Sequence, residues 1–247
     1  MRNAIRSEVR KILSTRSMWL LLLLGLVLEV VSSFVGLAAG KPIDFPARLD
    51  QISFLHFGTT NVCLLFVILG IRALGDEFAY DTVTPSLQVD PNRSRLLAAK
   101  ALTYAGAAAL YAVVALGIMV PVAAVIVQAR QLDVAISAGS VMAAAAGSVA
   151  AVVLWATIGV AVGAIVRHRV PVLVGTLVWL AILETGLHGA LKSAAKFLPG
   201  QLTSALTRAG GSDPKLFEPV VAAALLAALT AALLAASGAS LRRDITR

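Results

Sequence analysis

The sequence predicts an all-α protein in which residues 1–247 form a single transmembrane domain with six transmembrane helices. Two uncharged runs support this prediction most directly. Residues 101–127 and 134–166 contain no charged side chain, and each run exceeds the roughly 20 residues that a helix needs to cross a bilayer core. Hydrophobic residues make up 59% of the chain, charged residues only 14%, and the mean hydropathy is +0.88. A soluble domain of this length needs far less apolar surface for its core.

The distribution of basic residues predicts the topology. The six expected spans comprise residues 18–37, 54–74, 97–127, 138–166, 170–191 and 219–241. An even number of spans returns both termini to one side of the membrane. With that side inside, 14 of the 21 Lys and Arg residues fall in inner segments, as the positive-inside rule requires. We therefore expect both termini to be cytoplasmic, and we attribute the net charge of +8 to topology and not to nucleic-acid binding.

The N-terminal segment, residues 2–15, is expected to form an amphipathic basic helix on the inner leaflet. Ile5, Val9, Ile12 and Leu13 recur at helical spacing, and basic residues take the other positions. A topology anchor and a mechanical element are both compatible with this pattern. The apolar run that follows is longer than the core of a usual signal peptide, so we do not expect cleavage.

Two acidic residues lie inside expected spans. Glu29 falls near mid-bilayer, where ionisable groups are costly, so it either lines a translocation path or accepts a structural hydrogen bond. Glu184 and His188 are four residues apart on one face of the fifth span, so they can form a polar pair. The following outer segment, residues 192–217, is weakly amphipathic. It either re-enters the membrane or rests on the headgroups.

The polar loop between the second and third spans, residues 75–95, is the candidate functional element. Thr84 followed by Pro85 predicts the start of a short cytoplasmic helix, and Ser94 is an expected cap of the third span. Because acids and bases balance here and aromatic side chains are available, we expect a docking surface for a protein partner. A plain solvated connector is the alternative. The candidate contact residues are Asp76, Glu77, Phe78, Tyr80, Thr82, Val83 and Thr84.

The sequence gives no sign of bound cofactors or metals. The Gly-x-x-x-x-Gly-Lys-Ser/Thr pattern that cradles ATP phosphates is missing, so we expect no ATP hydrolysis by this chain alone. The single cysteine, Cys63, lies in an apolar run. His56, His168 and His188 fall in separate elements, and this spacing does not predict a metal site.

Several motifs occur in a particular order along the six expected spans. They are Arg6-Ser7-Glu8-Val9-Arg10-Lys11 with Thr15-Arg16-Ser17-Met18-Trp19, the stretch from Gly75 to Leu87, the set Arg93, Arg95 and Lys100, and Glu184 followed by Phe197-Leu198-Pro199-Gly200. In this order the chain resembles the type-two family of ABC transporter permeases, especially its short actinobacterial members. One departure is Ala79, where these permeases often have a basic residue.

The resemblance implies a half-transporter of the bacterial cytoplasmic membrane. It implies an exporter in which two permease subunits, as a homodimer or heterodimer, pair in the lipid and separate ATPase subunits bind ATP and Mg. The loop after the second span would hold the coupling helix that contacts the ATPase. A non-transporting scaffold, immunity or sensor subunit is the alternative from another class. A proton-coupled carrier that uses Glu29 and Glu184 is a third, but the sequence lacks the internal repeats typical of such carriers.

Overall fold

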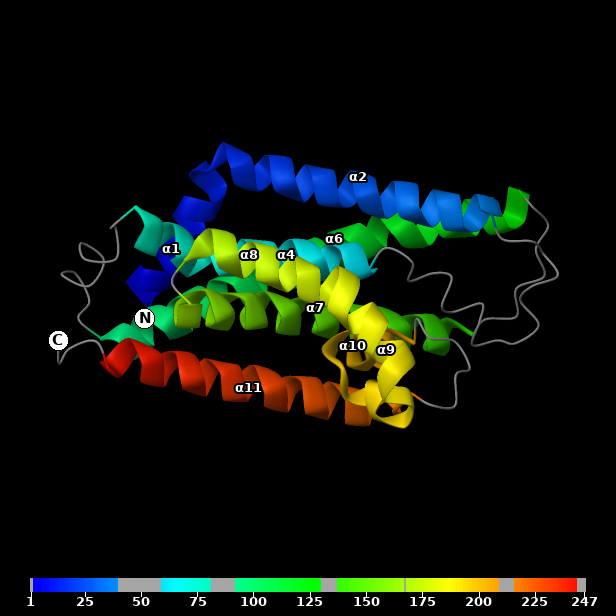
Figure 1. The fold of residues 1–247 in the computed structure, drawn as a ribbon. Helices are drawn as coiled ribbons and strands as arrows, with labels where there is room; N and C mark the ends of the chain where they lie inside the picture. The colour runs from blue at the N-terminus through cyan, green and yellow to red at the C-terminus, as the bar shows by residue number, and fades with distance from the viewer. Residues whose placement is uncertain are drawn as a thin grey trace.

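The computed structural model describes residues 2–39, 59–80, 92–129, 137–166, 168–208 and 216–243, and every regular element in these ranges is helical. The elements in chain order are α1 (Arg2–Ser14), α2 (Arg16–Ala39), α4 (Thr59–Ala79), α6 (Arg93–Ala129), α7 (Ala138–Val166), α8 (Arg169–Val178), the π-helix η2 (Trp179–Leu183), α9 (Glu184–Leu191), the 3₁₀-helix η3 (Lys192–Phe197), α10 (Pro199–Thr207) and α11 (Pro219–Arg243). The long helices lie along one common direction (Figure 1).

Three of these helices are long and apolar enough to cross a membrane. They are α6 over Arg93–Val125, α7 over Ala138–Val166 and α11 over Pro219–Leu241. The bent pair α1 and α2 meets the same criterion when taken together, which gives up to four candidate spans in the part of the chain that the structure describes. The all-α class and the membrane-spanning character are confirmed to this extent. The full count of six spans stays a prediction.

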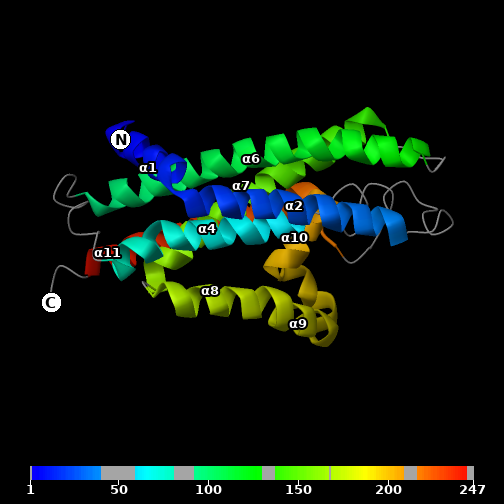
Figure 2. The same ribbon diagram turned by 90° about the horizontal axis from the view of Figure 1, so that it is seen from above.

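Helix α7 lies at the centre of the bundle and contacts α4, α6, α8, α10 and α11. Its closest neighbour is α4, because glycines let the two backbones approach each other. A Cβ atom at Gly159 would meet the backbone of Val67, and one at Gly70 would meet the backbone of Ala156. Helices α6 and α8 lie on opposite sides of α4 (Figure 2).

Helix α1 is joined to α2 through a sharp bend at Thr15. The axes of Asn3–Ser14 and Arg16–Ser32 differ by 71°. The Thr15 hydroxyl donates to the Lys11 carbonyl at 2.6 Å, and the Trp19 indole N–H donates to the Leu13 carbonyl at 3.0 Å. These local hydrogen bonds satisfy carbonyl groups that the end of α1 leaves without intrahelical partners.

The side of α1 that faces the bundle carries an acidic residue. Val9 and Leu13 are 40% and 56% exposed, whereas Glu8 is buried. Ile12 packs against the core. An acidic side chain of α1 therefore points into the bundle, and Val9 and Leu13 lie on the outer side of the helix. The predicted position of α1 on the inner leaflet stays a prediction.

The second and fifth expected spans also differ from their predicted limits. Helix α4 continues to Ala79, so Gly75, Asp76, Glu77 and Phe78 form its last turns and do not belong to a loop. The fifth is not a uniform α-helix, because the π-helix η2 separates α8 from α9. Helix α10 then packs against α7 and α11 and buries Leu202 and Leu206. Its re-entry into a membrane stays a prediction.

Candidate functional site: a buried charge cluster at the α1 end

Four charged side chains meet where α1, α4 and α6 come together. We call Glu8, Lys11, Glu77 and Lys100 the charge cluster. Helix α1 supplies Glu8 and Lys11, the C-terminal end of α4 supplies Glu77, and the first turns of α6 supply Lys100. Figure 1 shows α1 beside these ends of α4 and α6. The cluster thus lies beside both described stems of the loop that was predicted to contact a partner.

The ion pairs of the cluster are short, and each of the two ammonium groups contacts both carboxylates. Lys100 Nζ lies 2.8 Å from Glu8 Oε2, 2.8 Å from Glu77 Oε1 and 2.9 Å from the Ala73 carbonyl oxygen. Lys11 Nζ lies 2.7 Å from Glu8 Oε1 and 2.6 Å from Glu77 Oε1. The three donors of the Lys100 ammonium therefore each have an acceptor. Two acids and two bases give the cluster no net charge.

Burial makes these contacts strong and makes their loss costly. The side chains of Lys100, Glu8 and Glu77 are only 1%, 4% and 9% exposed, whereas that of Lys11 is 51% exposed. Burial by itself raises the pKa of Glu8, but the ammonium groups of Lys100 and Lys11 outweigh burial and lower it below its ordinary value. Burial lowers the pKa of Lys11, and hydrogen bonds from its ammonium to Glu77 and Glu8 more than reverse that shift. The charged forms of Glu8 and Lys11 are thus favoured at neutral pH.

Further polar contacts hold the same end of the bundle together. Arg72 Nε lies 3.1 Å from Asp76 Oδ2 within α4, and Arg72 Nη2 donates to Ser17 Oγ of α2 at 3.4 Å. Arg93, the first residue of α6, donates from Nη1 to the Leu241 carbonyl near the end of α11 at 2.6 Å. A cation at a helix C-terminus also complements the helix dipole.

The cap of α6 differs from the prediction. Asn92 precedes the helix, and its Oδ1 accepts hydrogen bonds from the Arg95 backbone N–H at 3.2 Å and from the Ser94 hydroxyl at 2.7 Å. The expected cap, Ser94, is already a helical residue. Asn is a preferred N-cap, because its side-chain oxygen satisfies an N–H group that lacks an intrahelical partner.

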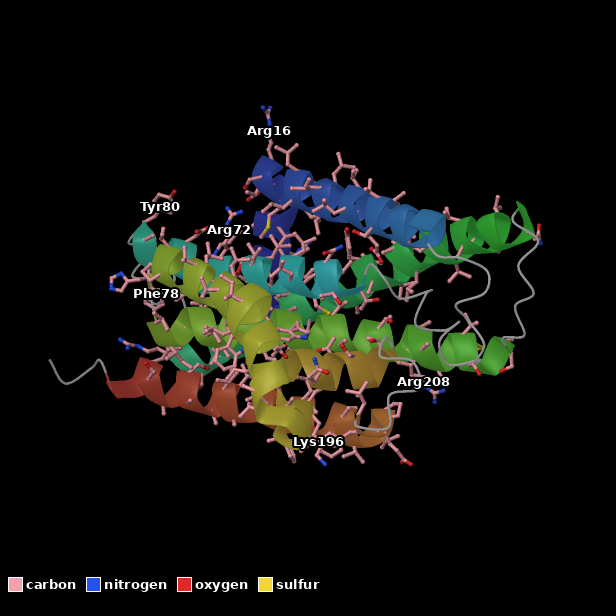
Figure 3. All side chains as sticks on the ribbon, turned by 45° about the vertical axis from the view of Figure 1, so that its right-hand side comes forward. Arg16, Arg72, Phe78, Tyr80, Lys196 and Arg208 are labelled. Carbon is pink, nitrogen blue, oxygen red and sulfur yellow. The ribbon has the colours of Figure 1, made fainter. Side chains whose placement is uncertain are left out.

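The candidate contact residues have different positions in the structure. Glu77 is buried in the charge cluster, Asp76 pairs with Arg72, and Phe78 is partly buried against the core. Tyr80 is 65% exposed and is the one described candidate that is open to a partner. Figure 3 shows Phe78, Tyr80 and Arg72 at the same end. Thr82, Val83, Thr84 and the predicted helix starting at Thr84 and Pro85 lie outside the described residues.

Glu29 is buried in α2, with 5% of its surface exposed. Its Oε2 has no hydrogen-bond partner within the described ranges. Neighbouring turns of α2 pack closely on α4 and α6. Gly25 lies against Leu65 of α4, and the Tyr111 hydroxyl of α6 donates to the Leu22 carbonyl at 2.9 Å. This observation concerns one carboxyl oxygen, so a path-lining role and a structural hydrogen bond of Glu29 both stay predictions.

Glu184 lies at the opposite end from the charge cluster and contacts the N-terminus of α10. Its Oε1 accepts hydrogen bonds from the backbone N–H groups of Gly200 and Gln201. A carboxylate at a helix N-terminus satisfies free N–H groups and complements the helix dipole. Glu184 therefore positions α10. The side chain of His188, its predicted partner, lies outside the described residues.

Sequence analysis missed the roles of Glu8 and Lys100. Both residues belong to quoted motifs, but neither was identified as part of a buried site. Two signals were present. Glu8 lies three residues after Ile5 and four before Ile12, so it shares the apolar face of a basic helix, and Lys100 follows three apolar residues at the start of a long span.

No protein-family model matches the chain, and a search of curated proteins finds no match.

Proposed function

We propose that this chain is the membrane-spanning permease subunit of an ATP-driven exporter, similar to the type-two ABC permeases. In this proposal it lies in the bacterial cytoplasmic membrane with six spans and cytoplasmic termini. A second permease subunit pairs with it in the bilayer, and soluble ATPase subunits supply ATP binding and hydrolysis. The chain itself holds no cofactor.

The charge cluster is the observation that most favours a coupling role. The segment between Tyr80 and Asn92 leaves from the end of α4 and returns at the start of α6. Both stems are bound to α1 through Glu77 and Lys100, which are buried and share ion pairs with Glu8 and Lys11. A plain connector needs no such junction. A force on this segment would reach three helices together, as an ATPase-driven movement requires.

Alternating access follows as the proposed mechanism. Closure of the ATPase would push the segment between α4 and α6, and the ion pairs would make α1, α4 and α6 move as one body. Helix α7 packs against both α4 and α6, so the movement would continue into the centre of the bundle. Such rigid-body rotation of packed helices is an ordinary way to open and close a path. Glu29 is a candidate residue of that path.

The test is to co-express the chain with the Walker-motif ATPase expected from a neighbouring reading frame. The purified chain alone should hydrolyse no ATP, and the co-purified complex should. For the contact itself, Cys63→Ser removes the single native cysteine, and Tyr80→Cys then places one thiol at the exposed stem. A short thiol-to-amine cross-linker should join this variant to the ATPase.

Leu110→Cys in the same background is the matched control. Leu110 is 68% exposed, but it lies inside the uncharged stretch of α6, where a cytoplasmic protein cannot reach. Cross-linking from both positions, or ATP hydrolysis by the isolated chain, contradicts the proposal. A partner that cross-links at Tyr80→Cys but shows the same ATPase activity with and without the chain would favour the scaffold or sensor alternative.

A further inference from the structure

A cavity of about 390 Å³ lies at the opposite end of the bundle from the charge cluster, between α4, α7, the π-helix region and α10. This volume falls in the range of roughly 300–1,000 Å³ that is usual for small-molecule sites. Figure 2 shows α10 between α4 and the α8–α9 segment, which borders this region. None of the charge-cluster residues lines the cavity.

Fixed contacts hold α10 in place beside this cavity. Glu184 holds the N-terminus of α10 through the backbone of Gly200, and the Trp155 indole N–H of α7 donates to Thr203 Oγ1 of α10 at 2.7 Å. A Cβ atom at Gly147 would meet the Leu206 carbonyl, so α10 also lies directly on the α7 backbone. The π-helix η2 forms the wall on the other side, and π-helical turns occur frequently at functional sites.

The lining has two chemically different parts. Leu64, Leu177 and Leu180 provide an apolar wall, and Leu177 is 39% exposed on the outside of the bundle. Gln201 and Ser204 provide amide and hydroxyl groups at the α10 side. This pairing suits a molecule with an apolar tail and a hydrogen-bonding head.

Glu184 also lines the cavity on its polar side, and it restricts the charge of the head group. A second carboxylate placed beside this carboxyl would be unfavourable, because like charges at close range repel each other. An ammonium or hydroxyl head meets no such penalty. The lining thus distinguishes amphiphiles of the same length by their head groups.

The geometry points to a binding site for a single-tailed amphiphile whose head donates hydrogen bonds and carries no negative charge. The tail would contact the Leu64, Leu177 and Leu180 wall, and the head would lie near Glu184 and Gln201. This inference concerns the cavity alone, and it holds whether or not the chain is a permease.

The three tryptophans of the chain provide the test. Trp155 lines the cavity and is 6% exposed, whereas Trp19 is 54% exposed on α2, away from the cavity. One variant, Trp19→Phe with Trp179→Phe, keeps only the cavity reporter. The other, Trp155→Phe with Trp179→Phe, keeps only the membrane reporter. Both are placed in phosphatidylcholine bilayers and titrated with brominated dodecylamine, dodecanol or dodecanoate, whose bromine quenches nearby indole fluorescence.

We expect the amine and the alcohol to quench Trp155 saturably, and Trp19 only in proportion to the amount dissolved in the bilayer. The half-saturation concentration for dodecanoate at Trp155 should be about tenfold higher than that for dodecylamine. Ser204→Leu, added to the variant that keeps Trp155, should fill part of the cavity and abolish saturable quenching.

A charge-removing variant and the pattern of quenching test the inferred binding site further. Glu184→Gln keeps the acceptor for the α10 backbone but removes the charge, so it should bring the dodecanoate value close to that of dodecylamine. Proportional quenching of Trp155 and Trp19 by all three compounds would overturn the inference, as would equal binding of amine and acid to the unaltered cavity. The measurement requires neither an ATPase nor transport, so its failure is distinct from failure of the proposed function.

Discussion

Replacing Lys100 by Met should destabilise the protein by about 3–5 kcal/mol, which is the usual cost of removing one partner of a buried ion pair. The structure explains why the upper part of this range applies. The Lys100 ammonium contacts two carboxylates and the Ala73 carbonyl within 2.9 Å. Without it, Glu8 and Glu77 remain buried and lose a shared cation, while Lys11 still contacts both. A total stability of about 5–15 kcal/mol is typical of folded domains, so the loss is a large fraction.

A second substitution separates the charge effect from the loss of packing. Lys100→Met together with Glu8→Gln leaves one acid, Glu77, and one base, Lys11, so the cluster is neutral again. Coupling energies between contacting residues are about 0.5–3 kcal/mol, and we expect the double variant to recover about 1–3 kcal/mol relative to Lys100→Met. An additive, more severe loss would contradict the ion-pair explanation.

Reversible unfolding in mixed micelles, followed by circular dichroism, measures these free energies. Arg6→Met is the control, because Arg6 is an exposed basic residue on the same helix, and its replacement should change stability by less than about 0.5 kcal/mol. If Lys100→Met has as small an effect as Arg6→Met, the cluster does not hold α1 in place.

Three other predictions concern Glu8, the contact between α4 and α7, and Glu29. Because the folded-state pKa of Glu8 is lowered from 4.5, its contribution to stability is present above about pH 4.5 and is lost as the pH falls below it, so the wild type and Glu8→Gln should converge in acid-unfolding curves. Gly159→Leu should weaken or abolish folding because the Val67 backbone occupies the space, whereas Gly106→Ala meets no atoms within 4 Å and should be neutral or stabilising in thermal denaturation. Glu29→Gln should reduce transport more than dimer yield if Glu29 lines the path, and wild-type behaviour of both Gln and Leu at this position would refute that role.

The long helices could be predicted from the sequence because their apolar runs have few competing structures. A run such as residues 138–166 has no charge, and in lipid its backbone groups must be satisfied within a helix. The start of α7 at Ala138 and of α11 at Pro219 agree with the predicted limits. The end of α4 at Ala79 does not agree with the predicted limit at Leu74. The polar residues after Leu74 were expected to lie in water, but Glu77 is buried and pairs with the buried Lys100.

The charge cluster could not be predicted in the same way. Lys11 and Glu77 are 66 residues apart, and Glu8 and Lys100 are 92 residues apart. No local pattern states which distant charges will meet, because the pairing depends on how the helices pack. The same limit applies to the contacts of Glu184 with the backbone groups of Gly200 and Gln201, which lie 16 and 17 residues away. The predicted pairing of Glu184 with His188 stays a prediction, because the side chain of His188 lies outside the described residues.

The cluster also limits how α1 can move. A buried, neutral set of ion pairs contributes little net stability compared with apolar packing, but separating its members exposes several uncompensated charges to an apolar environment. Rotation of α1 by one residue would remove Glu8 from Lys100 and bring exposed Val9 toward the bundle. Such a change breaks short contacts without forming equivalent ones. Helix α1 therefore has one strongly preferred orientation relative to α4 and α6, and a displacement of either stem should carry α1 with it.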